Sequence, residues 1–217
     1  MTTITINFKK ISIFIIVLFY AFIASSCSNH KLKNNFDYVY VLESKTEDKT
    51  PHNGTCFYSN GRFYTNAHLI LYKDFDEYMV AETIVAKDMD NKEKYELELV
   101  EYDISKDIAV LKANNISGNG LKIKKGYSSC IGEDVFTIGN LNNYGLAYGY
   151  GKITSNEKMF ANLGTNICYI QTNIEISGGN SGGPVFNYSN EVIGIMSLKL
   201  MDNGQYVDGV SFFVNID

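Results

Sequence analysis

Residues 179–186 read GNSGGPVF, a stretch that places Ser181 between glycines and directly before an apolar run. Glycines beside a serine let other backbone approach closely, and they allow several N–H groups to point in one direction. An exposed hydroxyl next to such donors is what nucleophilic catalysis on an acyl group requires. Taken alone, the stretch is also compatible with a glycine-rich turn.

Residues 65–69 read TNAHL and place His68 at the end of a predicted strand, beside apolar residues. The other two histidines, His30 and His52, lie in polar segments. A single histidine beside a strand is usually a structural residue. A neutral imidazole is, however, the usual base for a hydroxyl nucleophile, so the serine in residues 179–186 makes His68 a candidate base.

Residues 107–111 read DIAVL, so that Asp107 opens an apolar strand. An aspartate in this position is commonly a surface turn residue or a cap. It is also the pattern expected of a buried carboxylate that orients an imidazole. The acids elsewhere lie among charged neighbours and are interpreted as solvated.

The chain beyond its first 36 residues predicts short strands separated by turns. Asn60-Gly61, flanked by residues 56–58 and 62–65, is the strongest short hairpin signal in the sequence. This spacing of strands indicates barrels or a sandwich. The other predicted strands are 94–99, 107–112, 134–138, 148–154, 167–173, 191–198 and 206–214.

Composition restricts the class of protein further. The chain has 217 residues, of which 45% are hydrophobic and 13% aromatic, with only two prolines. These values exclude a disordered chain, a collagen and a coiled coil, and they support one sizeable core. The net charge is −5 and no basic stripe is present, so nucleic acid is not expected as a partner.

The first 27 residues are predicted to be an export signal. Lys9-Lys10 precede the apolar run Ile11–Ala24, which is short for a membrane span but suits a signal peptide. Residues 24–27 read ASSC and resemble a bacterial lipobox, in which Cys27 would carry the lipid, although Ala24 stands where leucine is usual. The alternatives are cleavage near the same serines and an uncleaved anchor. The protein is therefore expected to be exported and anchored by its lipid to a bacterial cell envelope, with residues 28–38 as a tether. If Cys27 carries no lipid, a periplasmic or secreted protein is expected.

Three cysteines follow Cys27, namely Cys56, Cys130 and Cys168. Because three is an odd number, at least one thiol has no partner within the chain. Buried free thiols are the expected state, since cysteine behaves as a small apolar residue. No Cys-x-x-Cys or Cys/His cluster is present, so neither a metal site nor another cofactor is expected.

A histidine, an aspartate and a serine in this chain order, in a β-rich chain, resemble the chymotrypsin-fold serine proteases. More narrowly, the sequence is similar to the HtrA/Deg branch over residues 54–214. The segments that carry the resemblance are TNAH (65–68), DIAVL (107–111), IGN (138–140), IQT (170–172), GNSGGP (179–184) and VIGI (192–195).

The resemblance implies a role for each candidate residue. Ser181 would be the nucleophile, His68 the general base and acid, and Asp107 the group that orients His68. The loop Gly179-Asn180-Ser181 would form the oxyanion hole, through the amides of its first and last residues. No cofactor is implied.

The resemblance also implies an all-β, chymotrypsin-like fold of two six-stranded β-barrels with the active site in the cleft between them. The protease domain would cover residues 39–217, with the first barrel at about 39–125 and the second at about 126–217. Relatives usually carry a PDZ domain afterwards, and none is expected here because the sequence ends at Asp217. Tandem glycines at 178–179 predict an oxyanion hole that forms only when a substrate or partner binds.

Substrate recognition follows from the same resemblance and stays open at Glu175. This acid either selects lysine or arginine at the residue before the scissile bond (P1), or it points into solvent beside an apolar pocket, which we favour. Met196, Ser197 and Leu198 are expected to pair with the substrate backbone. Phe212, on the far pocket wall, is expected to narrow the pocket.

Three functions are compatible with these features. The first is an exported serine endopeptidase that acts on unfolded or flexible proteins at the cell envelope. The second is a catalytically latent or silent protease-fold module that binds protein or peptide. The third is a protease with one dedicated target. A complete set of His68, Asp107 and Ser181 favours an enzyme.

Overall fold

The computed structural model describes residues 35–217, apart from residues 48, 75–76, 91 and 160–166. By its internal contacts the chain separates into two units, residues 1–35 and 36–217, and the fold below is that of the second unit. The predicted signal peptide (1–27), including Cys27, and most of the predicted tether (28–38) therefore lie outside the described residues.

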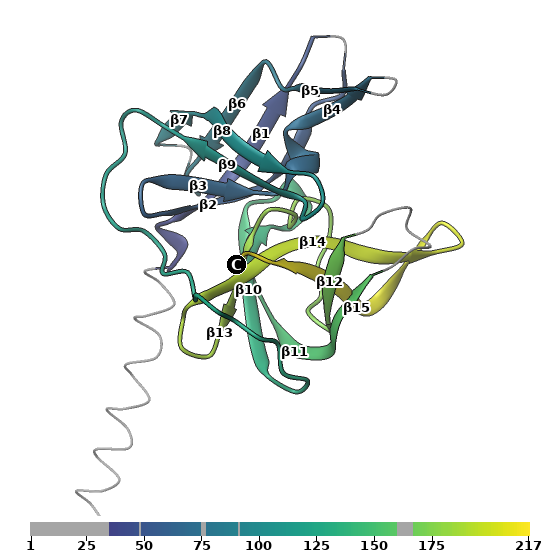
Figure 1. Ribbon diagram of the computed structural model, residues 1–217. Coiled ribbons are helices and arrows are strands. Elements are labelled where there is room, and N and C mark those ends of the chain that lie inside the picture. The colour runs from purple at the N-terminus through teal and green to yellow at the C-terminus, as the bar shows by residue number, and fades with distance from the viewer. Residues whose placement is uncertain (1–34, 48, 75–76, 91, 160–166) are drawn as a thin grey trace, which may run out of the picture. The chain divides into compact units, whose positions relative to one another are not determined.

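The first half of the unit is an antiparallel sheet of seven strands (Figure 1). Its strands are β1 (Val39–Lys45), β2 (His52–Ser59), β3 (Arg62–Thr65), β6 (Thr83–Lys87), β7 (Lys94–Glu96), β8 (Glu98–Asp103) and β9 (Ile108–Lys112). They are ordered β7-β6-β1-β2-β3-β9-β8, so β7 and β8 lie at opposite edges. Only Leu97 separates these two strands along the chain. Because one residue spans less than about 4 Å, the two edges must meet and the sheet must curl.

Two sequence predictions have different outcomes in this sheet. The hairpin at Asn60-Gly61 is confirmed, because both residues have positive φ (47° and 83°) and β2 pairs with β3 across them. The single strand predicted at 94–99 is wrong. The segment forms two strands with different partners, because β7 pairs with β6 and β8 pairs with β9. Buried Leu97 lies between them and donates its N–H to Ile84 O at 2.8 Å.

The second half is a closed antiparallel barrel of six strands (Figure 1). Its strands are β10 (Asp134–Asn140), β11 (Leu146–Met159), β12 (Cys168–Thr172), β13 (Pro184–Asn187), β14 (Val192–Asp202) and β15 (Gln205–Asn215). They run in the order β10-β11-β12-β15-β14-β13, and the pairing of β10 with β13 closes the ring. Apolar side chains that alternate along these strands fill its interior, among them Val135, Ile170 and Phe213.

The predicted all-β double barrel is confirmed, with one difference in detail. The first barrel is a curled sheet of seven strands, and the described residues contain no hydrogen-bonded ladder between its two edges. The segment between β9 and β10, where the boundary near residue 125 was predicted, joins the two halves. Leu121 N donates to Tyr58 O at 2.9 Å, and Lys124 N donates to Val192 O at 2.8 Å.

A small hairpin follows His68 and was not predicted. It consists of β4 (Leu71–Asp74) and β5 (Glu77–Val80), which pair with each other outside the larger sheets. The 3₁₀ turn η1 (Ala67–Leu69) leads into it, and a second such turn, η2 (Leu141–Asn143), follows β10. All four residues of β5 are exposed. The hairpin therefore projects from the first half (Figure 1), and its residues Leu71 and Tyr78 line the same pocket as His68.

Candidate active site

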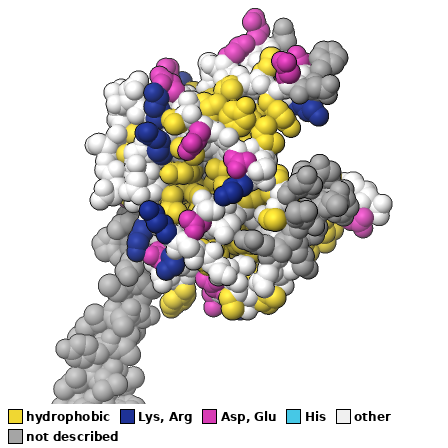
Figure 2. Space-filling model, viewed as in Figure 1, with side chains coloured by type: hydrophobic (Ala, Val, Ile, Leu, Met, Phe, Trp, Pro, Cys, Tyr) yellow, Lys and Arg dark blue, Asp and Glu magenta, His cyan; other side chains and the backbone are white. Residues whose placement is uncertain are grey.

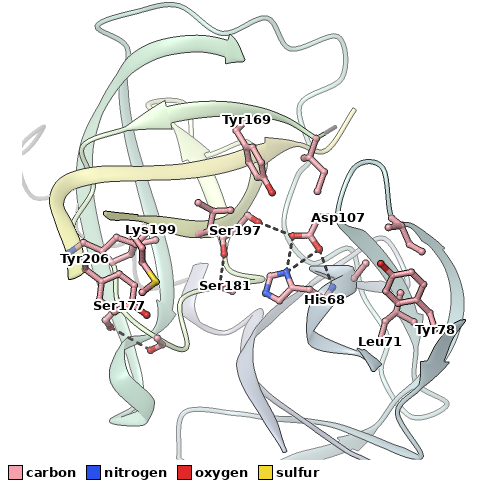
Figure 3. Close-up of a pocket in the computed structure, with 17 residues that line it drawn as sticks. His68, Leu71, Tyr78, Asp107, Tyr169, Ser177, Ser181, Ser197, Lys199 and Tyr206 are labelled. Atoms are coloured by element: carbon pink, nitrogen blue, oxygen red, sulfur yellow. Dashed lines mark hydrogen bonds and ion pairs between the residues drawn. The ribbon is translucent and has the colours of Figure 1, made fainter. Parts of the chain in front are cut away.

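His68 and Asp107 are brought together by the register of two neighbouring strands. β3 and β9 are antiparallel with Thr65 opposite Ala109, so the residues that follow β3 lie beside those that precede β9. His68 Nδ1 is 2.8 Å from Asp107 Oδ2 and 3.0 Å from Oδ1 (Figure 3). Because a carboxylate accepts hydrogen bonds, Nδ1 carries the proton and Nε2 remains able to accept one.

The Asp107 carboxylate is buried and fully engaged. Oδ1 also accepts the backbone N–H of His68 at 3.0 Å, and Oδ2 accepts the Ser197 hydroxyl at 2.8 Å. The Asp107 backbone has φ = +54°, which is uncommon for a residue other than glycine. Its carbonyl holds this conformation by accepting hydrogen bonds from Ala67 N (3.2 Å) and Asn66 Nδ2 (3.0 Å). The acid is therefore fixed relative to the imidazole.

Two opposing effects act on the pKa of His68. Partial burial of the ring lowers the pKa because the charged form loses solvation, whereas the charge of Asp107 and its hydrogen bond to Nδ1 raise it. The balance is a pKa above the ordinary value for histidine. The side chain keeps 48% of its exposure, so the ring is accessible from the cleft.

Ser181 comes from the second barrel, and its hydroxyl is not paired with His68. Ser181 Oγ donates to the backbone carbonyl of Ser197 at 2.6 Å (Figure 3). Within the described part of the chain, no hydrogen bond joins Ser181 to His68. The two side chains nevertheless line one cleft.

The loop that carries Ser181 requires its glycines and is docked on β2. Gly179 and Gly182 have φ of +95° and +86°, and a Cβ at Gly182 would lie 1.9 Å from Thr55 O. Thr55 N donates to Ser181 O at 2.8 Å, and Thr55 Oγ1 donates to Gly179 O at 2.7 Å. One threonine of the first sheet thus holds both ends of the Gly179–Ser181 segment.

The same loop leaves two amides available for an anion. Gly178 O accepts a hydrogen bond from Asn142 N at 2.8 Å, so in this trans peptide the N–H of Gly179 points the other way. Among the described residues, neither this amide nor that of Ser181 donates to a protein acceptor. The amide of Asn180, between them, is engaged, because it donates to the carbonyl of Ser177 at 3.2 Å.

A mostly apolar pocket of about 530 Å³ opens beside Ser181 and His68. Figure 2 shows hydrophobic side chains gathered below the β4–β5 hairpin, and Figure 3 shows Leu71 and Tyr78 on one side of His68, with Lys199 and Tyr206 beyond Ser181 on the other. Its apolar lining includes Leu71, Tyr78, Ile104, Ile176, Leu198 and Tyr206.

A family model described as the trypsin-like peptidase domain matches residues 53–195, about two thirds of the chain. The chain belongs to the trypsin-like peptidase family. His68, Asp107 and Ser181 all lie within the matched residues of this trypsin-like peptidase domain. The predicted enzyme class, a serine protease, is confirmed by this family membership.

Curated relatives of the trypsin-like peptidase domain include HtrA-type proteases, which confirms the resemblance to that branch. A probable periplasmic serine endoprotease DegP-like from Pseudomonas putida is 30% identical over 159 residues, covering 73% of this chain and 31% of the relative. Serine protease HTRA2, mitochondrial, from Drosophila grimshawi is 28% identical over 210 residues, covering 92% and 45%. This chain therefore spans about a third to a half of the length of these relatives.

Solved structures agree with the double-barrel fold. The serine endoprotease from Yersinia pestis has a TM-score of 0.67 and 26% identity, covering 86% of this chain and 61% of that one. A structure described as the HtrA-type protease AlgW with tripeptide has a TM-score of 0.71 and 23% identity, covering 86% and 58%.

The residues predicted to bind substrate are divided between the pocket and the core. Ser197 and Leu198 line the pocket. Met196 and Phe212 do not. Strand alternation turns Met196 into the barrel interior, where it is 0% exposed, and Phe212, which is 1% exposed, is buried against the ring of Tyr169. The Glu175 carboxylate is 64% exposed and is likewise not part of the pocket wall.

Sequence reasoning missed three contributions to this site. Ser197 was expected only as part of a substrate-binding strand, yet its hydroxyl binds Asp107, and a serine inside an apolar strand was the available signal. Thr55 and Tyr78 lay in segments with no motif. Their roles depend on how the two halves pack, which no local pattern encodes.

The remaining sequence predictions concern cysteines, metals and membranes. All three described cysteines are free, but only Cys56 is buried, and the expectation that Cys130 and Cys168 are buried is wrong. The described residues contain no cluster of acids, histidines and cysteines suited to a metal ion. Among the same residues, no helix is long and apolar enough to span a bilayer.

Proposed function

We propose that this protein is a serine endopeptidase that hydrolyses peptide bonds through an acyl-enzyme at Ser181. The observation that carries the proposal is the His68–Asp107 pair, with Nδ1 2.8 Å from Oδ2, in one cleft with a serine whose neighbouring amides are available. A neutral imidazole held in this tautomer is the base that a hydroxyl nucleophile needs. Membership of the trypsin-like peptidase family supports the same reaction.

The proposed reaction begins with a movement of the Ser181 hydroxyl. In the resting structure this hydroxyl donates a hydrogen bond to the backbone carbonyl of Ser197. A substrate strand that pairs with β14 presents a backbone N–H to that carbonyl and displaces the hydroxyl toward His68 Nε2. Binding of the substrate and activation of the nucleophile are then one event.

The chemical steps follow from the protein's own groups. Ser181 Oγ attacks the scissile carbonyl carbon while His68 Nε2 takes its proton, and the amides of Gly179 and Ser181 receive the oxyanion. His68 then gives the proton to the leaving amine as the C–N bond breaks. Water, deprotonated by the same nitrogen, attacks the acyl-enzyme and releases the acid and Ser181. Asp107 stabilises the imidazolium throughout.

We further propose that the P1 residue is apolar. Ile176, Leu198 and Tyr206 form the pocket wall near Ser181, and the Glu175 carboxylate lies outside that wall. Comparing kcat/KM for fluorogenic peptides that differ only in valine or arginine at P1 tests this preference. A preference for arginine contradicts it.

Unfolded or flexible proteins at a bacterial cell envelope are the proposed substrates. Support comes from the DegP-like relatives, which are named as periplasmic endoproteases, and from the signal-like segment Lys9–Ala24. Attachment of lipid at Cys27 is part of the proposal. Expression of the full chain and of Cys27→Ser, followed by membrane fractionation, tests it, because only the chain that keeps Cys27 can be lipidated and held in the membrane fraction. An equal distribution contradicts the lipid anchor.

The alternative is a latent or silent module that binds protein, and the hydrogen bond from Ser181 to Ser197 O favours it over a permanently active enzyme. Fluorophosphonate labelling of the mature chain separates these functions, with Ser181→Ala and heat-denatured protein as controls. Labelling of the wild type alone supports the peptidase. Labelling only when an unfolded protein is added indicates latency, and none under either condition contradicts the proposal.

A further inference from the structure

A group of charged residues, of which Lys199 lines the pocket, gathers where β14 and β15 meet the pocket. The side chain of Lys199 is only 12% exposed. Its Nζ lies 3.0 Å from Glu175 Oε2, 3.0 Å from Asp208 Oδ1 and 6.0 Å from the centre of the Tyr206 ring. Hydrogen bonds to Asp208 and to Glu175 raise the pKa of Lys199, so its ammonium is charged at neutral pH.

This lysine is unlike the other ion-paired lysines of the described residues. Their side chains are between 25% and 76% exposed, as expected for surface pairs. Lys199 instead lines the same pocket as Leu198 and Tyr206, with its charge turned to two acids. Its aliphatic stem therefore fills space that is continuous with the substrate cleft.

Both carboxylate oxygens of Glu175 are engaged within the chain in the resting structure. Oε1 accepts the backbone N–H of Gly209 at 2.6 Å, and Oε2 accepts the ammonium of Lys199. Gly209 has φ = +70°, so the turn that brings its amide to Glu175 favours glycine. Each carboxylate oxygen thus has one partner within the chain, while the side chain remains 64% exposed.

We infer that Lys199 is a specificity-determining residue, which fills with its own stem and ammonium the place that a lysine or arginine side chain at P1 would occupy. The inference rests on the proposed peptidase function. A basic P1 residue is excluded in two ways, because the space is filled and because the acids already have a cation. An apolar P1 residue needs no carboxylate partner, and it is short enough not to reach the space that Lys199 fills.

Removal of Lys199 is expected to reverse this selectivity. With Lys199 the cluster carries one net negative charge, and without it Glu175 and Asp208 leave two beside an open space. A guanidinium, whose several N–H donors suit carboxylates, is the best-matched ligand for that site. Glu175 would then act on substrate, although it does not line the pocket in the intact protein.

Kinetics on two variants test the space and the charge separately. Lys199→Met keeps most of the stem but removes the charge, and Lys199→Ala removes both. For peptides that differ only at P1, we expect the arginine-to-valine ratio of kcat/KM to rise at least tenfold in Lys199→Ala and less in Lys199→Met. Adding Glu175→Gln to Lys199→Ala should return the arginine-to-valine ratio of kcat/KM to the wild-type value.

Lys152→Ala is the matched control, because Lys152 pairs with Asp134 at 2.5 Å in the same barrel but does not line the pocket. It should leave the ratio unchanged. An unchanged ratio in a folded Lys199→Ala protein that still cleaves the valine peptide overturns the inference while leaving the proposed function intact.

A binding measurement keeps the inference testable if no variant cleaves any peptide, the result that would contradict the proposed function. The fluorescence of 4-aminobenzamidine, an amidinium probe, reports occupation of the site without catalysis. We expect binding by Lys199→Ala, and at least tenfold weaker binding by the wild type and by Lys199→Ala/Glu175→Gln. Equal binding by all three proteins overturns the inference.

Discussion

The two halves of the candidate triad are supported in different ways. His68 and Asp107 flank paired strands of one sheet, and the carboxylate accepts hydrogen bonds from His68 and from Ser197. Ser181 sits in a loop of the other barrel, and its hydroxyl faces a backbone carbonyl instead of the base. The base is therefore preorganised by strand register, whereas the nucleophile depends on a loop that Thr55 holds across the two halves.

The largest effect is expected from removing the nucleophile. Ser181→Ala should reduce kcat by about 10⁶-fold, because the hydroxyl that forms the proposed acyl-enzyme is lost. The hydroxyl makes one hydrogen bond, to Ser197 O, so thermal unfolding should change by only a few degrees. Steady-state kinetics and a melting curve measure both. Residual activity above about 1% would place the nucleophile elsewhere.

Removing the charge of the orienting acid tests the preorganised half. Asp107→Asn should lower kcat by about 10⁴-fold, because the amide can present an N–H to Nδ1 and stabilise the wrong tautomer of His68. Fluorophosphonate labelling should slow in parallel. A loss smaller than tenfold would mean that the 2.8 Å contact to His68 does not serve the reaction.

The pH dependence of kcat/KM should report the same pair. The base must be neutral, and the pKa of His68 is raised, so activity should fall as pH decreases through a value above that of free histidine. Well below the pKa, each further pH unit costs about tenfold, because the neutral fraction falls in that proportion. In Asp107→Asn the limb should move to lower pH, since the charge that raises the pKa is gone. If the acidic limb of the pH profile stays at the same pH in Asp107→Asn, Asp107 is not the cause of the raised pKa of His68.

The smallest effect is expected at the contact that joins the nucleophile's loop to the first sheet. Thr55→Val removes the hydrogen bonds from Thr55 Oγ1 to Gly179 O and from Asn140 N to Thr55 Oγ1. A loss of about 1–3 kcal/mol in stability and about tenfold in kcat/KM is expected.

Thr137→Val is the matched control, because this buried hydroxyl donates to Pro184 O inside the barrel at 2.9 Å, away from the cleft. It should lower stability by a similar amount while kcat/KM stays within twofold. Equal losses of activity in both variants would show that Thr55 acts through stability alone.

Local patterns predicted what local chemistry determines. Asn60-Gly61 marked a hairpin because two consecutive positive φ values suit few residues, and the glycines around Ser181 marked a loop that admits no Cβ. His68 and Asp107 could be selected because each closes or opens an apolar strand. Their 2.8 Å contact could not be read from the chain, since it depends on the register between β3 and β9.

What the sequence did not reveal depends on packing between segments far apart. The alternation in residues 94–99 continues without a break, so nothing local marks Leu97 as the point where the backbone changes partners. Met196 was expected to contact the substrate because its neighbours Ser197 and Leu198 were expected to do so, yet strand alternation turns its side chain into the barrel interior. Lys199 resembles any exposed strand lysine until Glu175 and Asp208 are brought beside it.

Leu97 also determines how the first sheet meets other proteins. Because this one residue joins β7 to β8, the chain itself holds the two edges of the sheet against each other. A nick or permuted termini at this position would release both edges at once, each able to pair with a strand of another molecule. Short edges and charged residues such as Lys94 and Glu101 discourage that pairing. One buried linkage, short strands and charged side chains therefore act together to keep the ends of this open sheet from pairing with other molecules.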